Sequence, residues 1–179
     1  GDVIDGKYKI LNKIGQGGMS VVYLAMNERA NKMWAVKVLK KEVFADFPQM
    51  QHGLLSETNI LKNLHHKYLP GIADIIEDND DYLIVMDYVE GKTLLECMGD
   101  AGCFTVEAVV KIGIQLCEVL HYLHTRENPV IYRDMKPSNI MLKPDGDITL
   151  IDFGTARTFK NDHSEDTTCF PKDFCSTFF

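Results

Sequence analysis

The sequence predicts an α+β fold in two parts, a strand-rich first half followed by a mainly helical second half. Three apolar segments rich in β-branched and aromatic residues open the chain, at residues 8–11, 21–25 and 34–39. Beyond residue 92, apolar residues recur at helical spacing instead. With 179 residues, of which 45% are hydrophobic, the chain is long enough for one domain or two small lobes with a useful core.

The first part is expected to hold five strands and one helix. Two further strands, near residues 72–76 and 82–86, are separated by an acidic turn at 77–81. Ahead of them, from about residue 48 to 64, leucine and threonine recur at helical spacing, which predicts one amphipathic helix. These elements predict a compact α+β lobe over residues 1–86.

Residues 87–91 are expected to connect this lobe to a second part, 92–179, because the apolar strand ends there and a glycine interrupts the pattern. Two short strands are predicted in the second part, near residues 141–142 and 148–151. Thr105 is the predicted N-cap of a helix. The apolar face of that helix is formed by Val109, Ile112, Leu116, Leu120 and Leu123.

Charge and cysteine content exclude several classes of protein. The formal net charge is −7 and no run of lysine and arginine stands out, which argues against nucleic-acid binding. The five cysteines lack metal-ligand spacing, so we expect reduced thiols and a cytoplasmic protein. No apolar stretch approaches the ~18 residues of a membrane span, and a membrane tether would have to lie beyond this chain.

The first candidate site is a glycine-rich stretch between the first two strands, with Gly15, Gly17, Gly18, Ser20 and Val22. Glycines without a Cβ let backbone amides approach phosphate oxygens closely. The stretch differs from a Walker motif, because a strand follows it rather than a helix. By itself a glycine-rich hairpin is as often structural, but here we expect a flap over a nucleotide.

Lys37 lies inside the third apolar strand. An ammonium buried without a partner is costly, so this lysine is expected to meet a carboxylate or a phosphate. Glu57, on the apolar side of the predicted helix, is the candidate partner. The alternative is a lysine that faces solvent from an edge strand.

The strongest signal is the segment 132–139, followed further on by an Asp-Phe-Gly triplet that begins at Asp152. Phosphoryl transfer requires metal ions, a group that orients the attacking hydroxyl, and rigid placement of both. Asp134 can accept or orient the hydroxyl proton, and Lys136 can neutralise charge on the moving phosphoryl group. Asn139 and Asp152 provide the hard oxygen ligands that suit Mg²⁺.

On these motifs the chain resembles the eukaryotic-like protein kinase superfamily, from about Tyr8 to Arg157, in its bacterial form. The Lys136-Pro137 pair after Asp134 is the form found in serine/threonine kinases. The resemblance implies a bilobal fold and ATP-dependent phosphoryl transfer to serine and threonine hydroxyls of proteins. It also implies ATP and Mg²⁺ as cofactors, with Mn²⁺ as an alternative metal.

The resemblance also assigns residues to the nucleotide site. Lys37 would contact the α- and β-phosphates with Glu57 as its ion-pair partner, Met86 would be the gatekeeper, and the backbones of Asp87 and Val89 would bind adenine. Val22, Ala35 and Met141 would sandwich the adenine ring. The full nucleotide-binding set is Gly15, Gln16, Gly17, Gly18, Ser20, Val22, Ala35, Lys37, Met86, Asp87, Val89 and Met141.

Two departures from the family pattern change the expectations. Tyr132 stands where histidine is usual; both rings fill the same stacked position, and the tyrosine hydroxyl needs a polar partner. No Ala-Pro-Glu follows Gly154, which predicts a domain truncated within the activation segment and an incomplete C-terminal lobe. The helix at 109–123 would then have one side uncovered, which predicts self-association through that face.

Two other functions compete with protein phosphorylation. A chain without the lower helices could bind nucleotide and yet transfer no phosphate to protein. A small-molecule kinase of the aminoglycoside-phosphotransferase type shares the fold, but usually lacks the Lys-Pro pair after the catalytic aspartate and seldom has its metal-binding aspartate in Asp-Phe-Gly.

Overall fold

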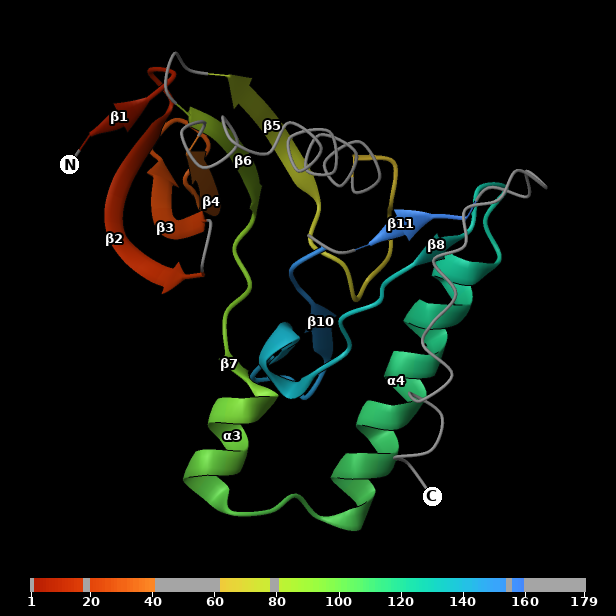
Figure 1. Cartoon of the computed structure of the whole chain (residues 1–179). Helices are drawn as coiled ribbons and strands as arrows, with labels where there is room; N and C mark the ends of the chain where they lie inside the picture. Colours follow the sequence, from red (N-terminus) through yellow and green to blue (C-terminus); the bar gives the residue numbers. More distant parts are fainter. Residues whose placement is uncertain (1, 18–19, 41–61, 78–80, 154–155, 160–179) are drawn as a thin grey trace.

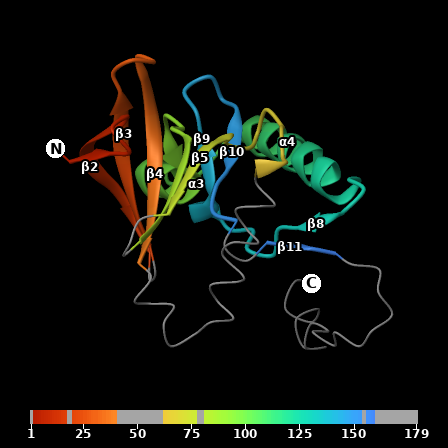
Figure 2. The same cartoon turned by 90° about the horizontal axis from the view of Figure 1, so that it is seen from above.

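The computed structural model describes residues 2–17, 20–40, 62–77, 81–153 and 156–159 of the chain. The helix predicted at 48–64 lies outside these ranges except for its last three residues. Figure 1 shows the strands of the first part above two helices of the second part, and Figure 2 shows β9 and β10 between the first sheet and helix α4.

Six strands form the sheet of the first part, in the order β1-β2-β3-β4-β6-β5, and every neighbouring pair is antiparallel. The five predicted strands are confirmed, and the two-residue strand β1 is an addition. Strand β2 runs on to Gln16, so the predicted break at Gly15 is wrong and the turn starts at Gly17. The bounds are β1 Val3–Ile4, β2 Tyr8–Gln16, β3 Ser20–Asn27, β4 Lys32–Lys40, β5 Ile72–Glu77 and β6 Asp81–Asp87.

The two faces of this sheet hold different clusters. Side chains directly opposite each other on paired strands lie on the same face. Val36, which is opposite Val85, belongs to a buried cluster with Tyr8, Ala25 and Leu83. Lys37, which is opposite Ile84, lies on the other face. The alternation along β4 therefore separates an apolar core from the face that carries the candidate lysine.

The second part contains two α-helices, a short 3₁₀ helix and five short strands in its described residues. Helix α3 was not predicted, although Thr93 and Glu96 form the capping box that signals a helix start in sequence. No helix among the described residues is long and apolar enough to cross a membrane. The bounds are β7 Lys92–Thr93, α3 Leu94–Ala101, α4 Val106–His124, β8 Val130–Ile131, η1 Pro137–Asn139, β9 Ile140–Leu142, β10 Ile148–Leu150 and β11 Arg157–Thr158.

The predicted N-cap of α4 is confirmed, because the Thr105 hydroxyl accepts the backbone N–H of Ala108 at 3.2 Å. Of the predicted apolar face, Ile112 and Leu123 are buried, Leu116 and Leu120 pack partly buried against the same cluster, and Val109 is 54% exposed. The buried residues of α4 are Ile112, Gln115, Val119 and Leu123. The apolar pattern did not include Gln115, a polar residue that is buried at the centre of this face.

Gln115 is 4% exposed and joins α4 to the turn between β9 and β10. Its Oε1 accepts the backbone N–H of Ile148 at 2.8 Å. Its Nε2 donates to the carboxylate of Asp147 at 3.0 Å. Both ends of the amide are therefore satisfied, as a buried polar side chain requires.

The stretch that precedes β5 packs with the second part rather than with the sheet. Leu64, Tyr68 and Leu69 are buried in the same cluster as Leu123 of α4. The carbonyl of Tyr68 accepts the backbone N–H of Leu150 at 2.9 Å. This stretch therefore anchors the start of β5, and with it the first sheet, to the second part.

His66 lies on this stretch against aromatic rings. Its ring centroid is 4.8 Å from that of Tyr122 and 5.4 Å from that of Tyr68, and its Nδ1 accepts the backbone N–H of Tyr68 at 3.2 Å. Burial lowers the pKa of the His66 imidazole, with the nearby Lys67 ammonium acting in the same direction. The neutral ring is the form that this packing favours.

Gly91 fixes the connection between the two parts. Its φ of 137° is in a region that L-residues rarely adopt, and an added Cβ would overlap the carbonyl oxygen of Leu142. Lys92, the next residue, pairs with Leu142 of β9. Glycine thus lets the chain leaving β6 approach the backbone of β9 closely.

Replacing Gln115 by methionine is expected to lower the free energy of unfolding by about 2 kcal/mol, since the buried N–H of Ile148 loses its acceptor. Chemical denaturation monitored by circular dichroism measures the change. Val109→Met is the matched control at an exposed position of the same helix, with an expected change below ~0.5 kcal/mol. Equal stabilities of the two variants would contradict the role given to Gln115.

Candidate active site

The pairing of β9 with β10 in a short hairpin brings together the segments that precede and follow it. Ile140 at the start of β9 lies opposite Leu150 at the end of β10. The loop before β9 therefore meets the segment after β10, and the backbone N–H of Ile151 donates to the carbonyl of Asn139 at 2.9 Å. Asp152 follows at once, so it lies beside the loop that carries the other candidate residues.

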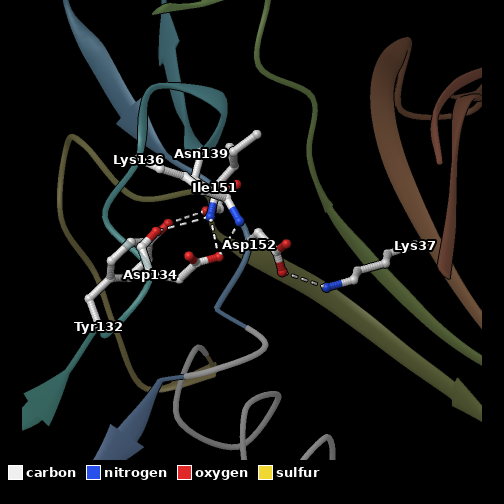
Figure 3. A network of polar contacts seen from close by, with 7 residues as sticks. All are labelled: Lys37, Tyr132, Asp134, Lys136, Asn139, Ile151 and Asp152. Carbon is white, nitrogen blue, oxygen red and sulfur yellow. Dashed lines mark hydrogen bonds and ion pairs between the residues drawn. The ribbon is translucent and has the colours of Figure 1, made fainter. Parts of the chain in front are cut away.

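Three side chains of the loop before β9 form a polar cluster (Figure 3). One carboxylate oxygen of Asp134, Oδ2, lies 2.7 Å from the Lys136 ammonium and 2.9 Å from Nδ2 of Asn139. The same Nδ2 donates to the backbone carbonyl of Asp134 at 3.0 Å. Asn139 is 6% exposed, so its amide is held in one orientation, with Nδ2 on Asp134 and Oδ1 at the other end.

The hydrogen bond from Lys136 to Asp134 raises the pKa of the lysine, and the nearby charges of Asp134 and Asp152 act in the same direction. Lys136 therefore stays protonated at neutral pH. The loop therefore places the positive charge of Lys136 next to the carboxylate of Asp134. A fixed positive charge of this kind can stabilise negative charge on a group that is being transferred.

Lys37 crosses from β4 to the second part, as Figure 3 shows. Its ammonium lies 3.1 Å from Oδ1 of Asp152. The Lys37 side chain is only 12% exposed, whereas that of Asp152 is 51% exposed. A mostly buried lysine side chain thus meets an aspartate whose side chain is about half exposed.

Two residues of the site have left-handed backbones although neither is glycine. Arg133 has a φ of 70° and Asp152 a φ of 64°. Such conformations cost about 1–2 kcal/mol for residues with a Cβ, less for aspartate, and persist where the surroundings enforce them. One immediately precedes the polar cluster, and the other carries the carboxylate that meets Lys37.

Tyr132 contacts the chain on both sides of Asp152. Its hydroxyl donates to the carbonyl of Ile151, and its ring meets that of Phe153 edge-on with centroids 5.0 Å apart. Tyr132 is 2% exposed and Phe153 is 1% exposed. The polar partner that the hydroxyl was expected to need is therefore the residue preceding Asp152.

Several of the predicted nucleotide-binding residues lie on the face of the first sheet that carries Lys37, which we call the lysine face. Gly15 is opposite Val22, Val22 is opposite Lys37, and Ala35 is opposite Met86. Alternation along β4 puts Ala35 on the same face as Lys37. The backbone N–H of Gly17 donates to the carbonyl of Ser20 at 2.8 Å and closes the hairpin.

The remaining predicted residues lie elsewhere or outside the described ranges. Met141 is on β9 and pairs with Thr93 of β7, so it belongs to the second part. Asp87 is the last residue of β6, and Val89 lies in the connector. Gln16 is exposed at the end of β2. Glu57 and Gly18 lie outside the described residues, and their roles remain predictions.

The residues present fit a divalent metal that arrives with a phosphate ligand. No group of three histidine, cysteine, aspartate or glutamate side chains is close enough to hold a metal within the described ranges. Asn139 would contribute an amide oxygen, and Asp152 would contribute a half-exposed carboxylate. Mg²⁺ is commonly held by one or two carboxylates together with substrate phosphates, and these donors are of that kind.

An antiparallel sheet joined by a short connector to a mainly helical part, with a lysine and an aspartate in contact at the junction, defines a protein-kinase-like fold. The chain matches the family described as protein kinase domain over residues 8–178. This match covers most of the sequence, and the chain belongs to the protein kinase domain family.

Relatives of this chain include named serine/threonine kinases from bacteria and animals. Probable serine/threonine-protein kinase CPE1738 of Clostridium perfringens is 34% identical over 88% of this chain and 23% of the relative. Serine/threonine-protein kinase PrkC of Bacillus subtilis is 35% identical over 87% of this chain and 24% of the relative. RAC-beta serine/threonine-protein kinase of Homo sapiens is 31% identical over 95% of this chain and 34% of the relative. The chain thus spans about a quarter to a third of their lengths.

Tyr132→Phe is expected to lower the free energy of unfolding by about 1–2 kcal/mol, because the carbonyl of Ile151 loses a buried donor. Denaturant titration measures the change. Tyr88→Phe is the control on a tyrosine that is 38% exposed, with an expected change below ~0.5 kcal/mol. A loss in the control as large as that in Tyr132→Phe would contradict the bracing role.

Proposed function

We propose that the protein transfers the γ-phosphate of ATP to serine or threonine hydroxyls of other proteins. The observation that carries this proposal is the meeting of Lys37 from the sheet with Asp152, beside the cluster of Asp134, Lys136 and Asn139. Three separate segments of the chain supply these groups. The family to which the chain belongs and the names of its relatives support the same reaction.

In the proposed reaction the substrate hydroxyl attacks the γ-phosphorus as the bond to the bridging oxygen breaks, and ADP leaves. Asp134 receives the hydroxyl proton. Its Oδ2 is already engaged by Lys136 and Asn139, which leaves Oδ1 as the oxygen that takes the proton. Lys136 neutralises the charge that the phosphoryl group carries during transfer.

ATP would bind against the lysine face of the first sheet, on which Ala35 and Lys37 lie. Lys37 holds the α- and β-phosphates, and the hairpin of Gly15, Gln16, Gly17, Gly18 and Ser20 covers them. Val22, Ala35 and Met141 enclose the adenine ring beside Met86, while the backbones of Asp87 and Val89 bind its edge. Glu57 is assigned as the ion-pair partner of Lys37.

Asn139 and Asp152 would hold the divalent metal, for which Mg²⁺ is the proposed identity. When bound, the metal neutralises the phosphate oxygens and fixes the direction of transfer. The chain's own contribution is to hold the two ligands in place. Asn139 does so through its amide bonds to Asp134, and Asp152 through the backbone bond between Ile151 and Asn139.

We assign residues 1–86 to the first lobe, 87–91 to the connector and 92–179 to the second lobe. We propose that the chain acts in the cytoplasm, where ATP is abundant and thiols stay reduced.

Transfer of radiolabelled phosphate from Mg-ATP to a generic basic protein tests the reaction. Asp134→Asn is expected to lower the rate by at least about a hundredfold, since the variant has no carboxylate to take the proton. A thermal-shift titration with Mg-ATP checks that the variant still binds nucleotide. Transfer by the variant at the parent's rate would refute the role of Asp134.

Binding without transfer by the parent chain would instead support the nucleotide-binding alternative. If neither Mg-ATP nor Mg-ADP at millimolar concentration shifts the melting temperature, both the proposed phosphoryl transfer and the nucleotide-binding alternative are wrong.

Self-association is the second part of the proposal, through a surface different from the one first predicted. Ile112 and Leu123 of the expected face are buried within the chain. The apolar residues that remain exposed on α4 are Val106, Val109, Val110 and Ile114. Three of these, spaced four residues apart, line a groove of about 580 Å³ that lies apart from the candidate active site.

We expect the parent chain to be a dimer or larger assembly by light scattering at tens of micromolar. Ile114→Glu places a charge in the groove and should yield monomers. Leu95→Glu is the matched control on α3, because Leu95 and Ile114 are both 56% exposed, and it should leave the assembly intact. A monomeric parent chain would contradict this part of the proposal.

A further inference from the structure

Asp87 connects three segments at the end of β6. One carboxylate oxygen, Oδ1, lies 2.7 Å from the ammonium of Lys32 at the start of β4. The other, Oδ2, accepts the backbone N–H of Gly71 at 2.9 Å. The backbone N–H of Asp87 in turn donates to the carbonyl of Gly71 at 2.9 Å. We call this set of Lys32, Gly71 and Asp87 the hinge clamp.

The clamp requires glycine at position 71. A Cβ added to Gly71 would lie 2.8 Å from Oδ2 of Asp87, closer than carbon and oxygen approach without displacement. Gly71 precedes β5, and the buried Leu69 and Pro70 come directly before it. The carboxylate is thereby tied to a well-anchored part of the backbone.

The ammonium of Lys32 contacts the Trp34 ring as well as the Asp87 carboxylate. It lies 3.9 Å from the ring centroid of Trp34, two residues further along β4. Trp34 is directly opposite Asp87 in the pairing of β4 with β6. Lys32 therefore lies over an indole ring on its way to the carboxylate, an arrangement that adds cation–π attraction to the ion pair.

The clamp lies on the face of the sheet that is turned away from the proposed nucleotide site. Trp34 and Asp87 are opposite each other and share one face, while Ala35 and Met86 are opposite each other on the other face. The carboxylate of Asp87 therefore does not bind the ligand. Its effect reaches the other face through the main chain of Asp87, where the connector begins.

We propose that the hinge clamp positions the main chain of Asp87 for adenine and so sets the selectivity of the site for adenine over guanine nucleotides. The inference rests on the proposed function. The backbone N–H of Asp87 donates to the carbonyl of Gly71. The backbone carbonyl of Asp87 is therefore the group that would accept a hydrogen bond from the base. Adenine presents an amino donor where guanine presents a carbonyl, so a fixed acceptor attracts one base and repels the other. Asp87 is thus a positioning residue.

The test measures dissociation constants of ATP, GTP and tripolyphosphate, each with Mg²⁺, for the full chain and its variants. Asp87→Ala removes both carboxylate contacts and is expected to weaken ATP binding about five- to tenfold. Lys32→Met removes the exposed ion pair and the cation–π contact with Trp34 but leaves both hydrogen bonds between Asp87 and Gly71, and it should weaken ATP binding about two- to threefold. Tripolyphosphate lacks a base, so its dissociation constant should change less than about twofold in either variant. The ratio of the dissociation constants of GTP and ATP should become smaller in both variants.

Gly71→Ala supplies an independent variant, because it displaces the Asp87 carboxylate without removing any charge. It should weaken ATP binding in the same direction as Asp87→Ala. Gly113→Ala is the matched control, since an added Cβ there meets nothing within 4 Å. Lys9→Met is the control for the ion pair: Lys9 and Glu28 form a 3.1 Å pair on the same sheet, away from the connector.

The outcomes separate the two proposals. ATP binding within twofold of the parent in Asp87→Ala, Lys32→Met and Gly71→Ala would overturn the clamp and leave the proposed function intact. Equal weakening of ATP and tripolyphosphate would also overturn it, because that pattern indicates general loss of structure. A parent chain that binds no ATP would overturn the proposed function, and the clamp with it.

Discussion

The pairing of β9 with β10 is the constraint on which the site depends. Asp134 and Asp152 lie on either side of a single hairpin, and neither is in a regular element. The short hairpin between them sets the loop before β9 against the segment after β10, with Leu150 opposite Ile140. Gln115 of α4 holds the turn of that hairpin through the N–H of Ile148. A polar contact within the core of the second part thus fixes where the carboxylates lie.

Within the described residues, contacts at several places join the two parts of the chain. Gly91 allows the connector to approach β9, and the stretch around Tyr68 fastens the start of β5 to β10. Lys37 then spans the junction to Asp152. Because each contact joins a sheet residue or its flank to the second part, the face of the sheet with Ala35 and Lys37 is held over the polar cluster. The left-handed backbone of Asp152 is held by Tyr132, which contacts the preceding residue, Ile151, and the following residue, Phe153.

Much of this arrangement was predictable from local patterns, and the exceptions have physical causes. The strands of the first sheet follow from β-branched runs, and the start of α4 follows from Thr105. The predicted apolar face of α4 omitted Gln115, because this polar residue lies in the core with its amide hydrogen-bonded to β10 and the turn before it. Helix α3 had its signal at Thr93 and Glu96, which went unused. Short strands such as β8 and β11 have no signal of their own, since two residues carry no period.

The sequence by itself determined which chemical groups are present and their order along the chain, because lysine, aspartate and asparagine in these motifs are tied to phosphate and metal chemistry. Only the tertiary structure decided which of them touch. Lys37 and Asp152 are 115 positions apart, and no local pattern encodes a 3.1 Å contact over that separation. The same holds for Lys32 and Asp87, 55 positions apart, and for the hydroxyl of Tyr132 on Ile151. Such contacts arise from strand register and core packing, which depend on the whole chain at once.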